Sequence, residues 1–174
     1  MNDLVTSYTK LQKLFECQAK KEGTIYLPSI QPMVPVDFVF VAMEPSLKRW
    51  ARDYKDAKDK IKLGFKDFTY SLEDFILHYC AMNYLCSAGL TYYVTNLSKG
   101  AMDVNKADQK RQERYKLWFP LFKRELQIVA KQGAKIIAIG KEVANFLRKE
   151  GFDATPVLHF SGRAAKYRVK LIQG

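Results

Sequence analysis

Apolar and polar residues follow one another in blocks that predict a regular succession of strands and helices. Short apolar runs typical of buried strands cover residues 37–43, 91–96, 135–139 and 155–159. Between and around them, helical spacing of apolar residues predicts helices over residues 4–21, 47–62, 72–86, 107–131 and 142–149, with a kink at Pro120. Strands that alternate with helices favour a three-layer α/β/α sandwich around a four-stranded parallel sheet.

The length of the chain fits one domain. Its 174 residues can bury one sizeable core but are too few for two ordinary domains, so we expect a single domain over 1–174, with residues 1–36 as an N-terminal helix and connection. The first residues lack a basic segment followed by an apolar one, and apolar runs are only strand-length. These features predict a soluble intracellular protein with no membrane partner.

The three cysteines are odd in number and form no CxxC pair. This pattern argues against a disulfide framework and against a zinc site, so no metal is expected.

The charge is strongly positive. The chain has 29 Lys and Arg against 18 Asp and Glu, a formal net charge of +11, which is typical of proteins that meet phosphate backbones. A basic surface that only keeps the protein soluble is the alternative. Cations follow three of the predicted strands, at Lys48, Arg49 and Arg52, at Lys99, and at Arg163, Lys166, Arg168 and Lys170. This distribution favours DNA as the partner, bound mainly through its phosphates.

Two residues with acid–base chemistry stand at predicted strand ends. Glu44 follows the first strand and precedes Pro45, which holds it in extended geometry, and His159 ends the fourth strand. Open parallel sheets build their sites at this edge. Glu44 could instead cap a helix or pair with Arg49. His78 lies in the middle of a predicted helix, where a core or surface position is the simpler interpretation.

Four segments in consistent order resemble the signature motifs of the uracil-DNA glycosylase superfamily. They are Val39-Phe40-Val41-Ala42-Met43-Glu44-Pro45-Ser46, Tyr93-Val94-Thr95-Asn96-Leu97-Ser98-Lys99, Ile136-Ile137-Ala138-Ile139-Gly140 and Val157-Leu158-His159-Phe160-Ser161-Gly162-Arg163. The resemblance covers roughly residues 37 to 165 and implies a uracil-DNA glycosylase-like fold. It also implies hydrolysis of the N-glycosidic bond of uracil or a related deaminated base in DNA.

The resemblance implies roles for individual residues. Glu44 would stabilise the cationic sugar and orient the attacking water, and His159 would donate to the base carbonyl. Asn96 carries the donors and acceptor that pair with the uracil edge, and Met43 would line the base pocket. Phe65 would stack on the flipped base, with Phe68 as the neighbouring alternative.

Further residues would contact DNA phosphates. These are Ser46, Lys99, Ser161, Gly162 and Arg163. Gly100 and Trp118 stand where some branches of the family carry cysteine ligands, so no iron–sulfur cluster and no other cofactor is expected. We expect a monomer, and the short segment after the second motif favours single-stranded DNA.

Departures from the family pattern leave other functions open. Ala42, Ser46 and Phe160 replace the usual Gly, Gly or Tyr, and Pro. The main alternative is a catalytically silent nucleic-acid-binding member of the superfamily. An unrelated α/β enzyme that acts on nucleotides is a third possibility, although no glycine-rich phosphate loop supports it.

Overall fold

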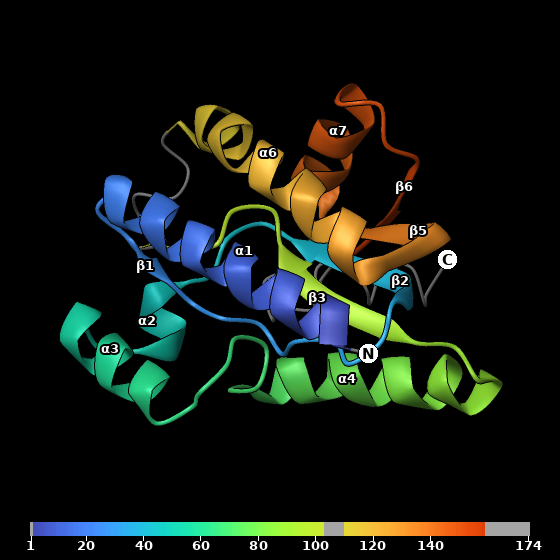
Figure 1. The fold of residues 1–174 in the computed structure, drawn as a ribbon, viewed down its shortest axis with the longest axis horizontal. Coiled ribbons are helices and arrows are strands. Elements are labelled where there is room, and N and C mark those ends of the chain that lie inside the picture. Colours follow the sequence, from blue (N-terminus) through green and yellow to red (C-terminus); the bar gives the residue numbers. More distant parts are fainter. Residues whose placement is uncertain (1, 103–109, 159–174) are drawn as a thin grey trace, which may run out of the picture.

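The computed structural model describes residues 2–102 and 110–158 and shows a mixed α/β fold (Figure 1). The helices are α1 (Asn2–Lys21), α2 (Leu47–Trp50), α3 (Tyr54–Lys62), α4 (Leu72–Tyr84), the 3-10 turn η1 (Cys86–Ala88), α6 (Arg111–Val129) and α7 (Lys141–Lys149). The strands are β1 (Ile25–Tyr26), β2 (Val36–Ala42), β3 (Tyr92–Asn96), β4 (Gly100–Ala101), β5 (Ala130–Ile139) and β6 (Ala154–Val157).

The central sheet confirms the predicted strands. It has four strands in the order β3-β2-β5-β6, and every neighbouring pair is parallel. Because β2 lies between β3 and β5, the carboxyl ends of three strands meet at one edge. The order is compatible with a three-layer α/β/α fold.

Alternate residues of β2 face two different layers, as the two-residue period of a strand requires. Val39 and Val41 pack into the main core, which α1, α6 and α7 cover. Ala42 instead joins a smaller core with Val94 and Phe68, against which α4 packs. Figure 1 shows α4 on the opposite side of the sheet from α1 and α6.

Local sequence signals explain where several helices begin. Ser71 caps α4, because its side chain accepts from the backbone N–H of Asp74 while Asp74 accepts from the N–H of Ser71. Asp53 caps α3 in a similar way, through the N–H groups of Lys55 and Asp56. This second cap divides the single helix that the sequence predicts over residues 47–62 into α2 and α3.

Two further differences from the sequence prediction concern the region around α6. This helix continues through Pro120 but ends at Val129, and β5 begins directly after it at Ala130, earlier than predicted; residues 107–109, where the helix was expected to begin, lie outside the described residues. A small antiparallel sheet of β1 and β4 was not predicted, because two-residue strands carry no periodic signal. In the part of the chain that the structure describes, no helix is long and apolar enough to cross a membrane.

Candidate functional site

The carboxyl ends of β2 and β3 are joined side by side. Ala42 and Asn96 are register partners, and the backbone N–H groups of Leu97 and Ser98 donate to the carbonyls of Ala42 and Met43 at 2.8 and 3.1 Å. Glu44 follows β2 by two residues, and Asn96 is the last residue of β3. Both predicted site residues therefore lie at the same edge of the sheet.

The carboxylate of Glu44 is held by side chains of α6. Its Oε1 accepts from Nη2 and Nε of Arg111 at 3.0 and 3.2 Å, and its Oε2 lies 3.3 Å from Nη2 of Arg114. The hydroxyl of Tyr115 lies 3.4 Å from the same oxygen, and the side chain of Glu44 is only 6% exposed. An ion pair of Glu44 with Arg49 was one alternative from the sequence; the side chain of Arg49 is not described, and the partners that the structure describes are these two arginines of α6.

This environment fixes the protonation of Tyr115. Burial, and then the negative charge of Glu44, raise the pKa of Tyr115 above its ordinary value. The phenol, which is protonated near neutral pH even at its ordinary pKa of 10.0, therefore remains a donor to higher pH as well. Two guanidinium groups and one hydroxyl thus surround the anion that was expected to face a sugar.

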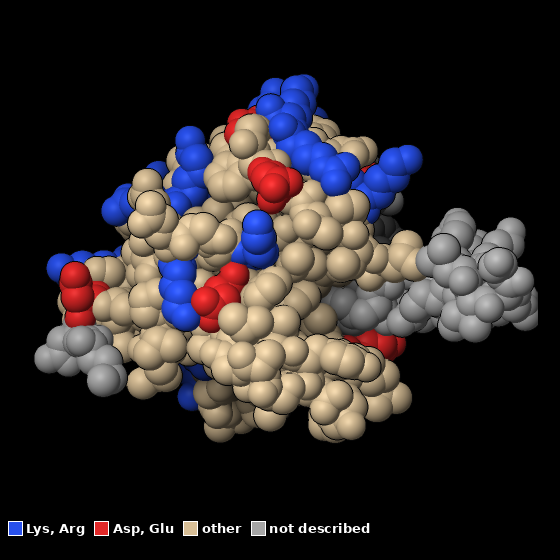
Figure 2. Space-filling view, turned by 90° about the vertical axis from the view of Figure 1, so that its right-hand side faces the viewer, with Lys and Arg blue, Asp and Glu red and all other residues tan. Residues whose placement is uncertain are grey.

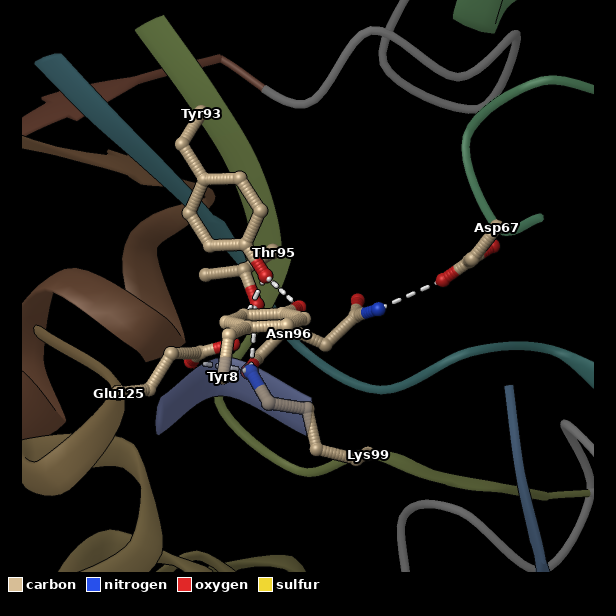
Figure 3. Close-up of polar contacts among 7 residues, drawn as sticks. All are labelled: Tyr8, Asp67, Tyr93, Thr95, Asn96, Lys99 and Glu125. Atoms are coloured by element: carbon tan, nitrogen blue, oxygen red, sulfur yellow. Dashed lines mark hydrogen bonds and ion pairs between the residues drawn. The ribbon is translucent and has the colours of Figure 1, made fainter. Parts of the chain in front are cut away.

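The side chain of Asn96 points to the face of the sheet that α4 covers, whereas Glu44 contacts α6 on the other face. The Asn96 side chain is buried, and its Nδ2 donates to Oδ2 of Asp67 at 2.6 Å (Figure 3). Asp67 lies between α3 and α4, in the segment that holds Phe65 and Phe68, although the sequence analysis did not select Asp67 itself. The amide of Asn96 is thereby fixed in one orientation by a carboxylate.

Lys99 does not lie on the surface, and this corrects the phosphate contact expected for it. Its Nζ is 2.6 Å from Oε2 of Glu125 in α6, with the two side chains 2% and 0% exposed. The ammonium also donates to the hydroxyl of Thr95 and to the main-chain carbonyl of Asn96 (Figure 3). A cation enclosed in this way cannot reach a DNA backbone.

The buried ion pair belongs to a larger polar network. Oε1 of Glu125 accepts from the hydroxyls of Tyr93 and Thr95 at 2.9 and 3.0 Å, and the hydroxyls of Tyr93 and Tyr8 are 2.6 Å apart. Burial lowers the pKa of Lys99, whereas the charge of Glu125 acts in the opposite direction. The network ties the end of β3 to both α1 and α6.

A pocket of about 240 Å³ lies on the Asn96 side of the sheet. It is lined by Ile30, Gln31, Pro32, Asp67, Phe68, His78, Tyr92, Tyr93 and Val94. His78 bridges two of these walls, because Nε2 lies 3.0 Å from the carbonyl of Phe68 and Nδ1 lies 2.8 Å from the hydroxyl of Tyr92. A carbonyl only accepts, so Nε2 carries the hydrogen and, in the neutral ring, Nδ1 accepts from Tyr92.

The position of the two phenylalanines favours the alternative named from the sequence. Phe65 is 40% exposed and packs edge-on against Tyr70. Phe68 is 6% exposed, lines the pocket, and has a positive φ of 60°, which an aromatic residue rarely adopts. Of the two phenylalanines, Phe68 therefore lines the pocket, together with Tyr92 and Tyr93, and Phe65 does not.

Two other predicted residues lie away from the pocket. Met43 is partly buried against the main core, on the α6 side. Ser46 precedes α2 and pairs with Met102, but its side chain makes no capping hydrogen bond. His159, Ser161, Gly162 and Arg163 lie outside the described residues, so their roles stay predictions.

Sequence reasoning missed Asp67, Tyr92, Arg111 and Glu125. His78 was considered from the sequence but interpreted as a core or surface residue, whereas the structure places it at the pocket wall, on the side of α4 that faces the sheet. The others become recognisable only through contacts with residues far away in the sequence. No model of a known protein family matches this chain, and no curated protein matches it either.

Proposed function

We propose that this protein is a DNA base-excision enzyme that hydrolyses the N-glycosidic bond of uracil or a related deaminated base. The proposal rests on the resemblance to the uracil-DNA glycosylase superfamily. One observation carries it further. Glu44 and Asn96 come from neighbouring parallel strands and lie at one carboxyl edge, because Ala42 and Asn96 are register partners. Crevices at such edges are the usual ligand sites of open α/β sheets.

The reaction separates charge, and the chain offers groups for both ends. As the bond breaks, the sugar becomes cationic and the base gains negative charge, so an anion is needed near the sugar and a donor near the base. Glu44 supplies the anion and would also orient the attacking water. His159 is proposed as the donor to the base carbonyl.

The base would enter the pocket beside β3. Its walls combine the aromatic surfaces of Phe68 and Tyr92 with the polar groups of Asp67 and His78, a composition suited to a flat heterocycle with polar edges. The amide of Asn96 adjoins this pocket through Asp67. Reading the base edge would require the amide to exchange its contact with Asp67 for contacts with the base.

DNA binding also bears on the state of Glu44. Arg111 and Arg114 neutralise the carboxylate in the free protein. A phosphate of the bound strand would compete for these guanidinium groups, since arginine binds phosphate and carboxylate by the same paired geometry. Such competition would release the anion only when substrate is present.

The second candidate is a catalytically silent nucleic-acid-binding member of the same superfamily. The specific observation in its favour is that both oxygens of Glu44 already have cationic partners and that the side chain is only 6% exposed. If this ion pair persists on DNA, Glu44 serves the fold and no excision follows.

An excision assay separates the two candidates. The protein is incubated with single-stranded oligonucleotides that carry uracil, hypoxanthine or xanthine, and alkaline treatment then cleaves abasic products. The first candidate predicts cleavage at one or more of these bases. Asn96→Ala should lower the rate by orders of magnitude and leave binding to undamaged DNA nearly unchanged. Asn96→Asp is a poorer probe, because it would place a second carboxylate against Asp67.

Salt dependence tests whether nucleic acid is the partner at all. With a net charge of +11, affinity for undamaged single-stranded DNA should fall as salt rises, by a log–log slope of about −0.7 for each phosphate contacted. A slope near zero would rule out both candidates. A steep slope without excision of any base would leave the silent member.

A further inference from the structure

The outward face of α4 is apolar. Five of its residues recur at the three- and four-residue spacing of one helix face and are all exposed, namely Leu72, Phe75, Ile76, Tyr79 and Met82, here called the α4 stripe. Phe75 and Tyr79 are 65% and 60% exposed, and their rings stack on each other with centroids 6.2 Å apart. The side toward the sheet holds the buried Asp74 and Ala81 instead.

A solvated helix face would carry charges, and this one does not. From Phe75 to Ser98 the sequence has no Asp, Glu, Lys or Arg, although 27% of the whole chain is charged. Figure 2 shows the lower part of the molecule, where α4 lies, as largely uncharged, while Lys and Arg gather higher up, over the layer of α1, α6 and α7. The α4 stripe thus lies in an uncharged part of a strongly basic surface.

The area of the stripe is that of an interface. Large side chains have about 200 Å² each, so at their exposed fractions the five residues present on the order of 600 Å² of apolar surface. Monomers seldom expose a larger apolar patch than this. A standard interface buries about 800 Å² on each partner, of which about 60% is apolar. The stripe can supply that apolar part alone.

We propose that a second copy of this chain docks on the α4 stripe, with the two α4 helices antiparallel about a two-fold axis. Two copies with a net charge of +11 repel each other, so their contact must be made where cations are absent, and the stripe meets this condition. An isologous contact needs the same patch on both copies, and an apolar helix face is complementary to itself. The antiparallel arrangement also opposes the two helix dipoles favourably. This proposal departs from the monomer expected from the sequence.

Sedimentation equilibrium of the full chain over a wide concentration range tests the proposal. A reversible monomer–dimer equilibrium is expected, and Phe75→Glu should weaken it at least tenfold, because it would bury a carboxylate in each half of the contact. Leu117→Glu is the matched control, since Leu117 is an exposed apolar residue of α6 and the change in charge is the same. Circular dichroism monitors folding of each variant. A monomer at every concentration, or a dimer that Phe75→Glu leaves intact, would overturn the proposal.

A cross-linking measurement keeps the test independent of a disruptive variant. Cys17, Cys80 and Cys86 are free and exposed, so all three are first replaced by serine. In that background, Tyr79→Cys should form disulfide-linked dimers under mild oxidation, whereas Leu117→Cys should not. If the new thiol at Tyr79 is instead shielded from alkylation in a monomer, another segment of the same chain covers the stripe and the proposal is wrong. Linkage at neither position, or equally at both, would also contradict it.

Discussion

Nζ of Lys99 lies 2.6 Å from Oε2 of Glu125, and both side chains are almost completely buried. Lys99 follows the last residue of β3 by three positions, whereas Glu125 belongs to α6. The pair connects the end of β3 to α6, which covers the face of the sheet opposite to the one that the Asn96 side chain enters. Because the ammonium also donates to the carbonyl of Asn96, it helps to position the main chain at the candidate site.

Removal of one charge of this pair should be costly. We expect Lys99→Met to lower the free energy of unfolding by about 3–5 kcal/mol, since the carboxylate of Glu125 is left buried without its cation. The double variant Lys99→Met/Glu125→Gln should recover a large part of the loss, because the amide oxygen still accepts from Tyr93 and Thr95. Urea unfolding measures both. The single variant Glu125→Gln completes the comparison. If the losses of the two single variants simply add up to the loss of the double variant, Lys99 and Glu125 are not coupled.

Alkaline pH should destabilise the fold through the buried tyrosines of the same network. Burial, and then the charge of Glu125, raise the pKa of Tyr8 and of Tyr93 above the ordinary value of 10.0. The unfolded chain loses these protons above that value and the folded chain keeps them, so their stabilisation is complete below pH 10 and is lost as pH rises. Each tyrosine should contribute a loss of about 1.4 kcal/mol per pH unit.

Lys99 affects the same range with the opposite sign. Burial lowers its pKa, so the unfolded chain binds its proton more tightly and stability rises with pH up to the ordinary lysine value of 10.5. The net loss of unfolding free energy with rising pH should therefore become steep only above pH 10.5. Unfolding free energies at a series of pH values, with phenolate absorbance as a second signal, measure it. Tyr8→Phe should reduce the slope of the unfolding free energy against pH by about 1.4 kcal/mol per pH unit, the contribution of one proton. An unchanged slope would mean that Tyr8 does not keep its proton in the folded protein.

Two substitutions distinguish a catalytic Glu44 from a structural one. Glu44→Gln removes the anion, and Arg111→Gln removes one of its cationic partners while the anion remains. If Glu44 acts on the sugar, Glu44→Gln should lower the single-turnover excision rate by about 10² to 10³, whereas Arg111→Gln should cost much less. Both variants should lose comparable stability, because each breaks the same partly buried ion pair. Equal losses of excision would assign Glu44 to the fold alone.

The two phenylalanines should differ strongly in their effect on stability. Phe68→Ala should cost about 3–5 kcal/mol, since it empties a core position between Ala42, Val94 and Ile139. Phe65→Ala should cost less than about 1 kcal/mol, because its ring is half in solvent. Thermal unfolding of the two variants compares them directly. Similar losses would mean that Phe65 contributes more to packing than its exposure indicates.

The sequence by itself determined the sheet and the places where chemistry could be built. Apolar runs separated by amphipathic segments predicted all four strands of the central sheet, because the two-residue and 3.6-residue periods are local properties of the chain. The same runs placed Glu44 and Asn96 at strand ends. That these ends are neighbours follows from the parallel order of β3 and β2, which the structure supplies.

The tertiary structure alone decided which partners those residues have. Lys99 follows a strand end, between Ser98 and Gly100, and nothing local distinguishes a phosphate-binding lysine from one that pairs with Glu125 in the core. Glu44 similarly meets Arg111 only because α6 packs over the end of β2. Periodicity records which face of an element is buried, whereas the identity of a contact depends on how distant elements pack, and the energy of a buried charge depends on that contact.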